Sequence, residues 1–173
     1  MRKLSFILLA TLGCGGGGGR AADSTGTGIA SRTLAIEPSA VIGAERGLVL
    51  GVHIGMTEDS VRKLLGDPLR SGVEFADTAA QTALEFPMGT LRIAGAKGVV
   101  GFLCGGDDCR TADGVGIGDS LDVLLGTYGP TPPRGPAESP EALDYRLGTT
   151  DCNLTFTLAS GRVTSLELGC AAR

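Results

Sequence analysis

The sequence is poor in aromatic side chains and in histidine. It contains no tryptophan, two tyrosines, five phenylalanines and one histidine among 173 residues. Proteins that bind nucleic acids present clustered lysine and arginine to the phosphates and aromatic rings to the bases. This chain has no basic cluster, and its formal net charge is −4. We therefore expect no nucleic-acid partner.

The chain also lacks an apolar run of about 20 residues, the length that a membrane-spanning helix needs. The apolar run at residues 4–12 is much shorter; it follows Arg2 and Lys3 and precedes Gly13. A charged start, a short apolar run and a small residue are typical of an export signal. We predict that residues 1–13 are a signal peptide. Its removal leaves 13 basic against 19 acidic residues, a net charge of −6.

The next feature is the tetrapeptide Thr-Leu-Gly-Cys at residues 11–14, which resembles the lipobox of bacterial lipoproteins. The resemblance implies that Cys14 becomes the lipidated first residue of the mature protein. Each buried methylene of an acyl chain contributes about 0.8 kcal/mol to membrane attachment. In lipoproteins of this kind, an aspartate directly after the lipidated cysteine favours the inner membrane. This chain has Gly15 at that position, so the resemblance implies the outer membrane. We expect an exported chain that is anchored by its lipid and faces the periplasm or the cell surface.

Five consecutive glycines occupy residues 15–19 and open a stretch of small and polar residues. A phosphate-binding loop needs a strand before the glycines and a Lys-Ser or Lys-Thr pair after them. This chain offers neither, so we expect no nucleotide cofactor at the glycines. Small residues of this kind form flexible linkers. We predict that residues 14–46 are a tether between the lipid and a folded domain.

Four cysteines remain besides the one in the lipobox, and an even number in an exported chain indicates disulfides. Four cysteines allow three pairings. A hairpin turn near residues 160–161 would place Cys152 opposite Cys170, and Cys104 and Cys109 flank a short glycine-containing loop, so we predict these two pairs. The alternative is a four-cysteine zinc site, but the chain lacks the close Cys-x-x-Cys pairs of such sites. We expect no bound metal.

Two stretches of the chain are alike, GVHIGMTEDSVRKLLG at residues 51–66 and GVGIGDSLDVLLGTYG at residues 114–129. Each reads as a strand end, a glycine turn, an N-cap, a short amphipathic helix and a glycine stop. The N-caps are Thr57 and Ser120. Internal similarity of this kind indicates two equivalent structural units.

Alternating apolar and polar residues follow each predicted helix, a pattern typical of antiparallel strands with one face in water. The runs lie at residues 82–88, 91–93, 97–104 and 142–148, and in a last hairpin from residue 152 to residue 170. The sequence predicts an α+β fold of two tandem helix-plus-antiparallel-meander repeats, residues 47–110 and 111–173. The repeats are expected to form one sheet covered on one face by two short helices.

The same periodicity predicts which side chains are buried. The expected apolar stripes are Val61, Leu64 and Leu65 in the first helix, Leu121, Leu124 and Tyr128 in the second, and Leu154, Phe156 and Leu158 against Thr164, Leu166 and Leu168 in the last hairpin.

The run from Ile54 to Pro68, IGMTEDSVRKLLGDP, resembles the signature of the SmpA/OmlA (BamE-like) small outer-membrane lipoproteins. With GIGDSLDVLLGTYGP as a second copy, the tandem also resembles the duplicated fold of β-lactamase-inhibitory-protein-like domains. Both resemblances imply a binding module without catalysis. The first implies a scaffold that supports outer-membrane assembly or maintenance through an unknown envelope protein. The second implies a domain that inhibits a periplasmic or secreted enzyme.

Candidate catalytic residues are few. His53 is the single histidine, no Gly-x-Ser-x-Gly motif accompanies it, and the second copy has Gly116 at its place, so we interpret it as an ordinary strand-end residue. Glu85 and Glu167 could form a glycosidase pair, but both alternate with apolar residues and are expected to face water.

Two other patterns are interpreted as turns. Glycines at positions 114, 116 and 118 lack the spacing of a dinucleotide loop and suit a turn before a helix. Acidic residues at positions 107, 108, 113 and 119 lie near one loop, but they do not follow the EF-hand spacing of a calcium site.

The polar face of the predicted strands is the remaining candidate surface. Its mixture of charges and hydroxyl groups suits a wet interface with another protein. The predicted binding residues are Glu85, Arg92, Asp144, Arg146, Thr155, Thr157, Ser165 and Glu167.

Overall fold

The computed structural model describes residues 39–76 and 79–170, which lie in one compact unit. Its strands are β1 (Ala40–Ile42), β2 (Arg70–Ala76), β3 (Ala79–Phe86), β4 (Gly89–Ile93), β5 (Val99–Cys104), β6 (Pro133–Arg134), β7 (Ala142–Leu147), β8 (Cys152–Ala159) and β9 (Arg162–Cys170). Its helices are α1 (Glu58–Leu65) and α2 (Leu121–Tyr128), with short 3-10 helices η1 (Ala44–Gly47) and η2 (Gly95–Lys97).

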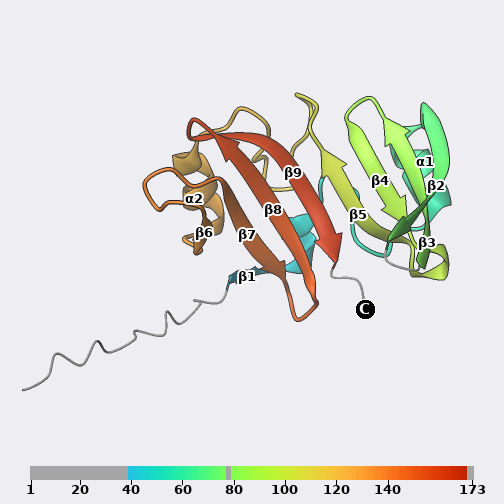
Figure 1. Ribbon diagram of the computed structural model, residues 1–173, viewed down its shortest axis with the longest axis horizontal. Coiled ribbons are helices and arrows are strands. Elements are labelled where there is room, and N and C mark those ends of the chain that lie inside the picture. Colours follow the sequence, from blue (N-terminus) through green and yellow to red (C-terminus); the bar gives the residue numbers. More distant parts are fainter. Residues whose placement is uncertain (1–38, 77–78, 171–173) are drawn as a thin grey trace, which may run out of the picture. The chain divides into compact units, whose positions relative to one another are not determined.

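All nine of these strands belong to one mixed sheet (Figure 1). The strand order is β1-β7-β8-β9-β5-β4-β3-β2, and β6 pairs with β7 beside this path. Every pairing is antiparallel except that of β1 with β7. The sheet is therefore two meanders joined where β5 pairs with β9.

The prediction of two tandem helix-plus-meander repeats is wrong. Four strands follow α1, whereas α2 is followed by the two-residue β6 and the three strands β7–β9, and β7 also pairs with a strand from before α1. Local turn and capping residues determine the similar stretches, but strand pairing depends on partners distant in sequence. The similarity is therefore confined to the turn, the cap and the helix. The broad α+β class holds.

The helix boundaries follow the predicted capping residues. The Thr57 hydroxyl accepts a hydrogen bond from the Ser60 amide, at 3.3 Å, and Ser120 caps α2 in the same way. Such caps satisfy amide groups that have no partner within the helix. Gly66 and Gly129 end the two helices with φ of +85° and +82°, a backbone conformation that favours glycine. These local predictions are confirmed.

The last part of the predicted tether contains regular structure. Residues 40–46 lie within the stretch 14–46 predicted as tether, yet they include β1 and most of η1. Arg46 holds this segment in place: its Nε lies 2.8 Å from Asp113 Oδ2, its Nη2 donates to the Thr127 carbonyl at 2.8 Å, and its guanidinium lies 4.7 Å from the Tyr128 ring centroid. Because the partners of Arg46 are distant in sequence, composition alone did not reveal the ordering.

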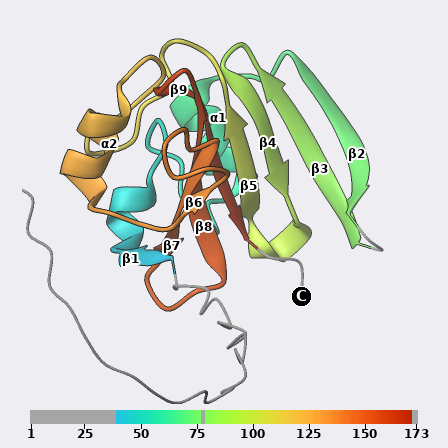
Figure 2. The same ribbon diagram turned by 60° about the vertical axis from the view of Figure 1, so that its left-hand side comes forward.

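The core lies between the sheet and the two α-helices (Figure 2). Val61 of α1 and Leu124 of α2 are fully buried against inward-facing strand residues. Tyr128, Tyr145 and Phe156 form an aromatic cluster with ring centroids 5.3 to 6.0 Å apart. Each tyrosine hydroxyl has a partner, Thr111 Oγ1 for Tyr128 and the Gly129 carbonyl for Tyr145. The core thus buries its only two tyrosines with their polar atoms satisfied.

Two predicted core positions are wrong. Leu64 is 48% exposed, because α1 buries one narrow stripe in which Val61 is the central residue. Thr164 is exposed and Val163 is buried instead, because the β8–β9 register shifts after Thr157. A bulge of this kind inserts one residue and exchanges the faces of the strand beyond it.

Both predicted disulfides are present. Cys152 and Cys170 are direct cross-strand partners in the β8–β9 ladder, and Cys104 and Cys109 close the loop after β5. Constraint of the unfolded chain by such loops contributes about 2 to 3 kcal/mol per bond. The disulfides therefore stabilise one end of the last hairpin and the start of the connection to α2.

We predict that the domain loses stability in alkali through its two tyrosines. Burial raises the pKa of Tyr128 and of Tyr145 to about 12, from 10.0. The unfolded chain ionises first as pH rises, so the stabilisation is complete below pH 10 and is lost between pH 10 and about 12. Denaturant titrations across this range should show the fall, and Tyr128→Phe with Tyr145→Phe should flatten it. An unchanged slope in the double variant would contradict this assignment.

Candidate functional site: the open face of the sheet

The strand register places all eight predicted binding residues on one face of the sheet. Direct cross-strand partners project to the same side, and one continuous row crosses seven strands. That row consists of Asp144, Thr155, Glu167, Leu103, Thr90, Glu85 and Arg70. Thr157 lies opposite Ser165, and Arg92 and Arg146 belong to the next row. We call this side the open face.

The helices pack on the other face. In Figure 1 α1 lies behind the strands at the right and α2 lies beside β7 at the left, and Figure 2 shows both on one side of the sheet. The side chains under them form the opposite rows, for example Tyr145, Leu154, Leu168, Phe102, Leu91 and Leu84, which are all fully buried or nearly so. Among residues 39–76 and 79–170, no helix covers the open face.

Asp144 and Thr155 differ from the other members of the open face because they are held by neighbours. The Thr155 hydroxyl donates to Asp144 Oδ1 at 2.6 Å, and the Arg134 guanidinium lies 2.8 Å from Asp144 Oδ2. Thr155 is buried. These contacts bind β6 and its loop to the sheet, so the two side chains are structural members of the face.

The remaining predicted residues are accessible. Arg146, Thr157 and Glu167 are exposed, and Arg92 and Ser165 are half-buried. Within the part of the chain that the structure describes, neither Arg92 nor Arg146 forms a salt bridge. Their guanidinium groups are therefore available to carboxylates of another molecule.

The row that contains the two arginines has no side chains at its centre. Its order across the strands is Arg146, Asn153, Gly169, Gly101, Arg92, Ala83 and Gly72. A Cβ added at Gly101 or Gly169 would meet no atom closer than 3.6 Å, so the fold itself does not require glycine there. Glycine in a strand often marks a place where another backbone approaches closely. Sequence reasoning missed this feature, because the two glycines are 68 positions apart and meet through the β5–β9 ladder.

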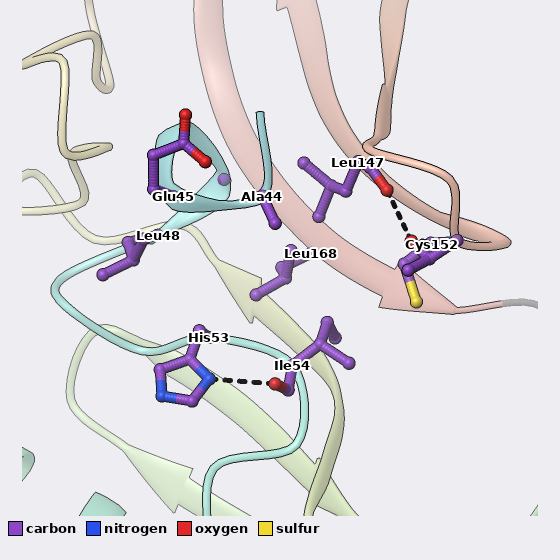
Figure 3. Close-up of a pocket in the computed structure, with 10 residues that line it drawn as sticks. Ala44, Glu45, Leu48, His53, Ile54, Leu147, Cys152 and Leu168 are labelled. Atoms are coloured by element: carbon purple, nitrogen blue, oxygen red, sulfur yellow. Dashed lines mark hydrogen bonds between the residues drawn. The ribbon is translucent and has the colours of Figure 1, made fainter. Parts of the chain in front are cut away.

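A second candidate site is an apolar pocket of about 330 Å³ on the helix side of the sheet (Figure 3). Its walls come from η1, from the loop at residues 48–54 and from the ends of β7, β8 and β9. They include Leu48, Ile54, Leu147 and Leu168, with Glu45 and His53 also in the lining. The sequence did not predict it because three distant stretches of the chain, residues 44–54, residues 147–152 and Leu168, contribute to it.

The chemistry of this pocket is limited by the contacts of its polar groups. His53 is exposed in a loop, and its Nδ1 lies 2.9 Å from the Ile54 carbonyl, so the prediction of a strand-end position is corrected to a loop. The Thr150 hydroxyl donates to the Leu147 carbonyl at 2.6 Å, and Cys152 is in a disulfide. The pocket thus offers apolar contact, the imidazole of His53 and the carboxylate of Glu45, with no free thiol.

The other sequence candidates are separated or occupied. Glu85 and Glu167 lie in one row but with β4 and β5 between their strands, about 14 Å apart at the usual strand spacing. Glycosidase carboxyl groups lie at most about 9.5 Å apart. Asp113 pairs with Arg46 and Asp119 with Arg110. In residues 39–76 and 79–170 no cluster of metal-ligating side chains is found.

Neither a protein-family model nor a curated protein matches the chain. Among solved structures, it is similar to an extracellular protein containing an SCP domain from Bacillus anthracis, at 10% identity over 68% of this chain and 44% of that one, with a TM-score of 0.41. The match thus spans less than half of that protein. A DUF4309 family protein from Bacillus subtilis is 14% identical over 70% of this chain and 83% of its own, with a TM-score of 0.39. Likeness at these TM-scores carries no conclusion about this chain.

The location of the protein follows from its covalent bonds. Disulfides form and persist in oxidising compartments, and this small domain has two. It is therefore an exported, non-cytoplasmic protein. Within the described residues no helix is long and apolar enough to cross a membrane. Residues 1–38, which include the predicted signal peptide and Cys14, lie outside the described part of the chain.

We predict that Thr155→Val and Thr157→Val will differ in stability although the two substitutions are chemically identical. The first removes the hydrogen bond to Asp144 beneath Arg134 and should lower the free energy of unfolding by about 1 to 2 kcal/mol. The second replaces an exposed threonine on the same strand and face, and should change it by less than about 0.5 kcal/mol. Urea denaturation measures both. If both substitutions changed the free energy of unfolding equally little, Thr155 would have no structural role.

Proposed function

We propose that this chain is an outer-membrane lipoprotein that binds a partner protein through the open face and catalyses no reaction. The observation that carries the proposal is the row of cross-strand partners that crosses seven strands, over which no helix of the described residues packs. At the usual strand spacing this row is about 29 Å wide. Specific protein interfaces bury about 800 Å² on each partner, which a face of this width accommodates.

The chemistry of the open face favours a protein over a small molecule. Ligands of low molecular weight bind in concave sites that surround most of their surface. The face instead presents separate groups of both signs, with Arg92 and Arg146 flanking the glycine pair and Glu167 in the adjacent row. Complementary charges on a partner would orient it and raise its association rate.

The glycine pair gives the proposed interface its centre. Gly101, which is buried, and Gly169, which is half-buried, place no side chain between Arg92 and Asn153. A partner segment can therefore approach the sheet closely there while its acidic groups reach the arginines on either side. Residues at the centre of an interface usually contribute most of the binding energy.

The lipid anchor rests on residues outside the described part of the chain. Its support is the resemblance of residues 11–14 to a lipobox, together with the oxidising environment that the two disulfides require. The inhibitor hypothesis uses the same face. It differs in its partner, an exported enzyme whose turnover the complex would block, whereas a scaffold would associate with outer-membrane proteins.

Photo-crosslinking in intact cells tests the open face. A photoreactive amino acid at position 167 should form one discrete adduct, and one at position 123, which is exposed on α2 on the other face, should form none. Gly169→Leu should reduce the adduct at position 167 at least tenfold by blocking close approach. Gly126→Leu adds the same side chain to an exposed helix position and should leave it unchanged.

The adduct pattern decides the proposal. Equal crosslinking from positions 167 and 123, or an adduct that survives Gly169→Leu, would contradict binding through the open face. Purification of the adduct then separates the two partner classes, because only an inhibitor should abolish turnover of the enzyme it captures.

We predict that Cys14→Ser abolishes metabolic labelling of the protein with radioactive palmitate. The thiol of Cys14 is the attachment point that the lipobox resemblance implies, and serine lacks it. The same substitution should release the protein from the membrane fraction. Persistent label in this variant would contradict the lipoprotein proposal and would leave the open-face proposal standing.

A further inference from the structure

The two edges of the sheet are protected to different degrees. At one end β1 has three residues, and β6, which begins with Pro133, has two. Short strands and proline are usual devices that prevent a sheet edge from pairing with another chain. At the other end lies β2, with seven residues and neither proline nor lysine, at the right-hand edge in Figure 2. In the described residues no strand pairs with the outer side of β2.

The apolar side chains of β2 are exposed. Ser71, Val73 and Phe75 share the inward side of the sheet, because Ser71 is the direct partner of the buried Leu84. Yet Val73 is 67% exposed and Phe75 is 74% exposed, as is Leu69, at 69%, immediately before the strand. An unprotected strand edge beside exposed apolar side chains is a site for pairing with a further strand.

The sequence of β2 is complementary to itself. If two copies pair antiparallel about a two-fold axis at Gly72, Arg70 lies opposite Glu74 of the second copy, and Glu74 lies opposite its Arg70. In the same register Leu69 faces Phe75 of the second copy, and the two Val73 side chains are diagonal neighbours. Each pair projects to one side of the sheet, since the residue numbers of the partners have the same parity.

The charge pattern on the open face continues across such a pairing. Arg70 Nε lies 4.0 Å from Glu85 Oε2 within one copy, and Glu74 of the second copy would approach Arg70 from the other side. The charges along this row would then alternate: Glu85 is negative, Arg70 is positive and Glu74 of the second copy is negative. Gly72 at the axis leaves free space, because an added Cβ there would meet no atom within 4 Å.

We propose that β2 is a homodimerisation edge, at which two copies of the chain pair antiparallel about Gly72 and join their sheets. The interface is isologous, so each ion pair and each apolar contact occurs twice. This inference is independent of the partner on the open face, because β2 is the outermost strand of that face and carries none of the eight predicted binding residues.

Cysteine crosslinking of the full chain tests the register. Gly72→Cys places two thiols at the axis and should yield a disulfide-linked dimer on non-reducing gels of envelope fractions. Gly126→Cys, an exposed position on α2 with equal free space, should not. A monomer in the Gly72→Cys variant, or a disulfide to a different protein, overturns the proposal.

Charge reversal tests the interface independently. Sedimentation of the purified full chain with Cys14→Ser should show a dimer, which Arg70→Glu or Glu74→Arg alone weakens by about tenfold. The double variant restores opposite charges in the same register and should recover the dimer to within about threefold. Glu138→Arg, in an exposed loop, controls for the change in net charge. A monomeric parent chain, or single reversals without effect, would overturn the proposal. Circular dichroism confirms that each variant is folded.

Discussion

The pairing of β5 with β9 is the constraint on which the rest of the structure depends. Four residues of each strand form this ladder, from Gly101 to Cys104 and from Leu166 to Gly169. It converts two local meanders into one sheet. On the inward side it places Phe102 against Leu168 beneath the helices, and on the outward side it aligns the two glycines. Without it the open face would be two narrow surfaces, each too small for the interface proposed here.

The ladder also explains why each side of the sheet has its own role. Period-2 alternation sends every second residue toward the helices, where Tyr128, Tyr145 and Phe156 fill the core. The intervening residues form the open face, where Asp144 pairs with Arg134 and Arg70 lies near Glu85, while Arg92 and Arg146 form no salt bridge within the described residues. Arg46 fixes residues 40–47 on the helix side of the sheet through its contact with Thr127. Ala44, Glu45 and Gly47 of this segment form part of the pocket wall there. The fold thus leaves one broad polar surface and one long edge accessible to other molecules.

The sequence predicted the features that depend on neighbouring residues. The N-caps Thr57 and Ser120, the hairpin that joins Cys152 to Cys170 and the strand face of Glu167 are all governed by local chemistry. It could not predict β1, because the ordering of that segment depends on β7 and on the contacts of Arg46. The edge strand β2 was missed as well, since its apolar side chains are exposed and its glycine is usual in a loop. The repeat hypothesis failed because two matching helices do not determine which strands pair.

Hydrogen exchange of the backbone amides, measured strand by strand, tests most directly whether the sheet is one cooperative unit. A single sheet predicts that β5 and β9 are the slowest strands to exchange, and that the β3–β4 and β7–β8 ladders open with the same free energy as global unfolding. The contrary result would be fast exchange across β5 and β9 with two separate opening free energies for the two meanders. That result would show two independent units and would remove the structural basis of the open face.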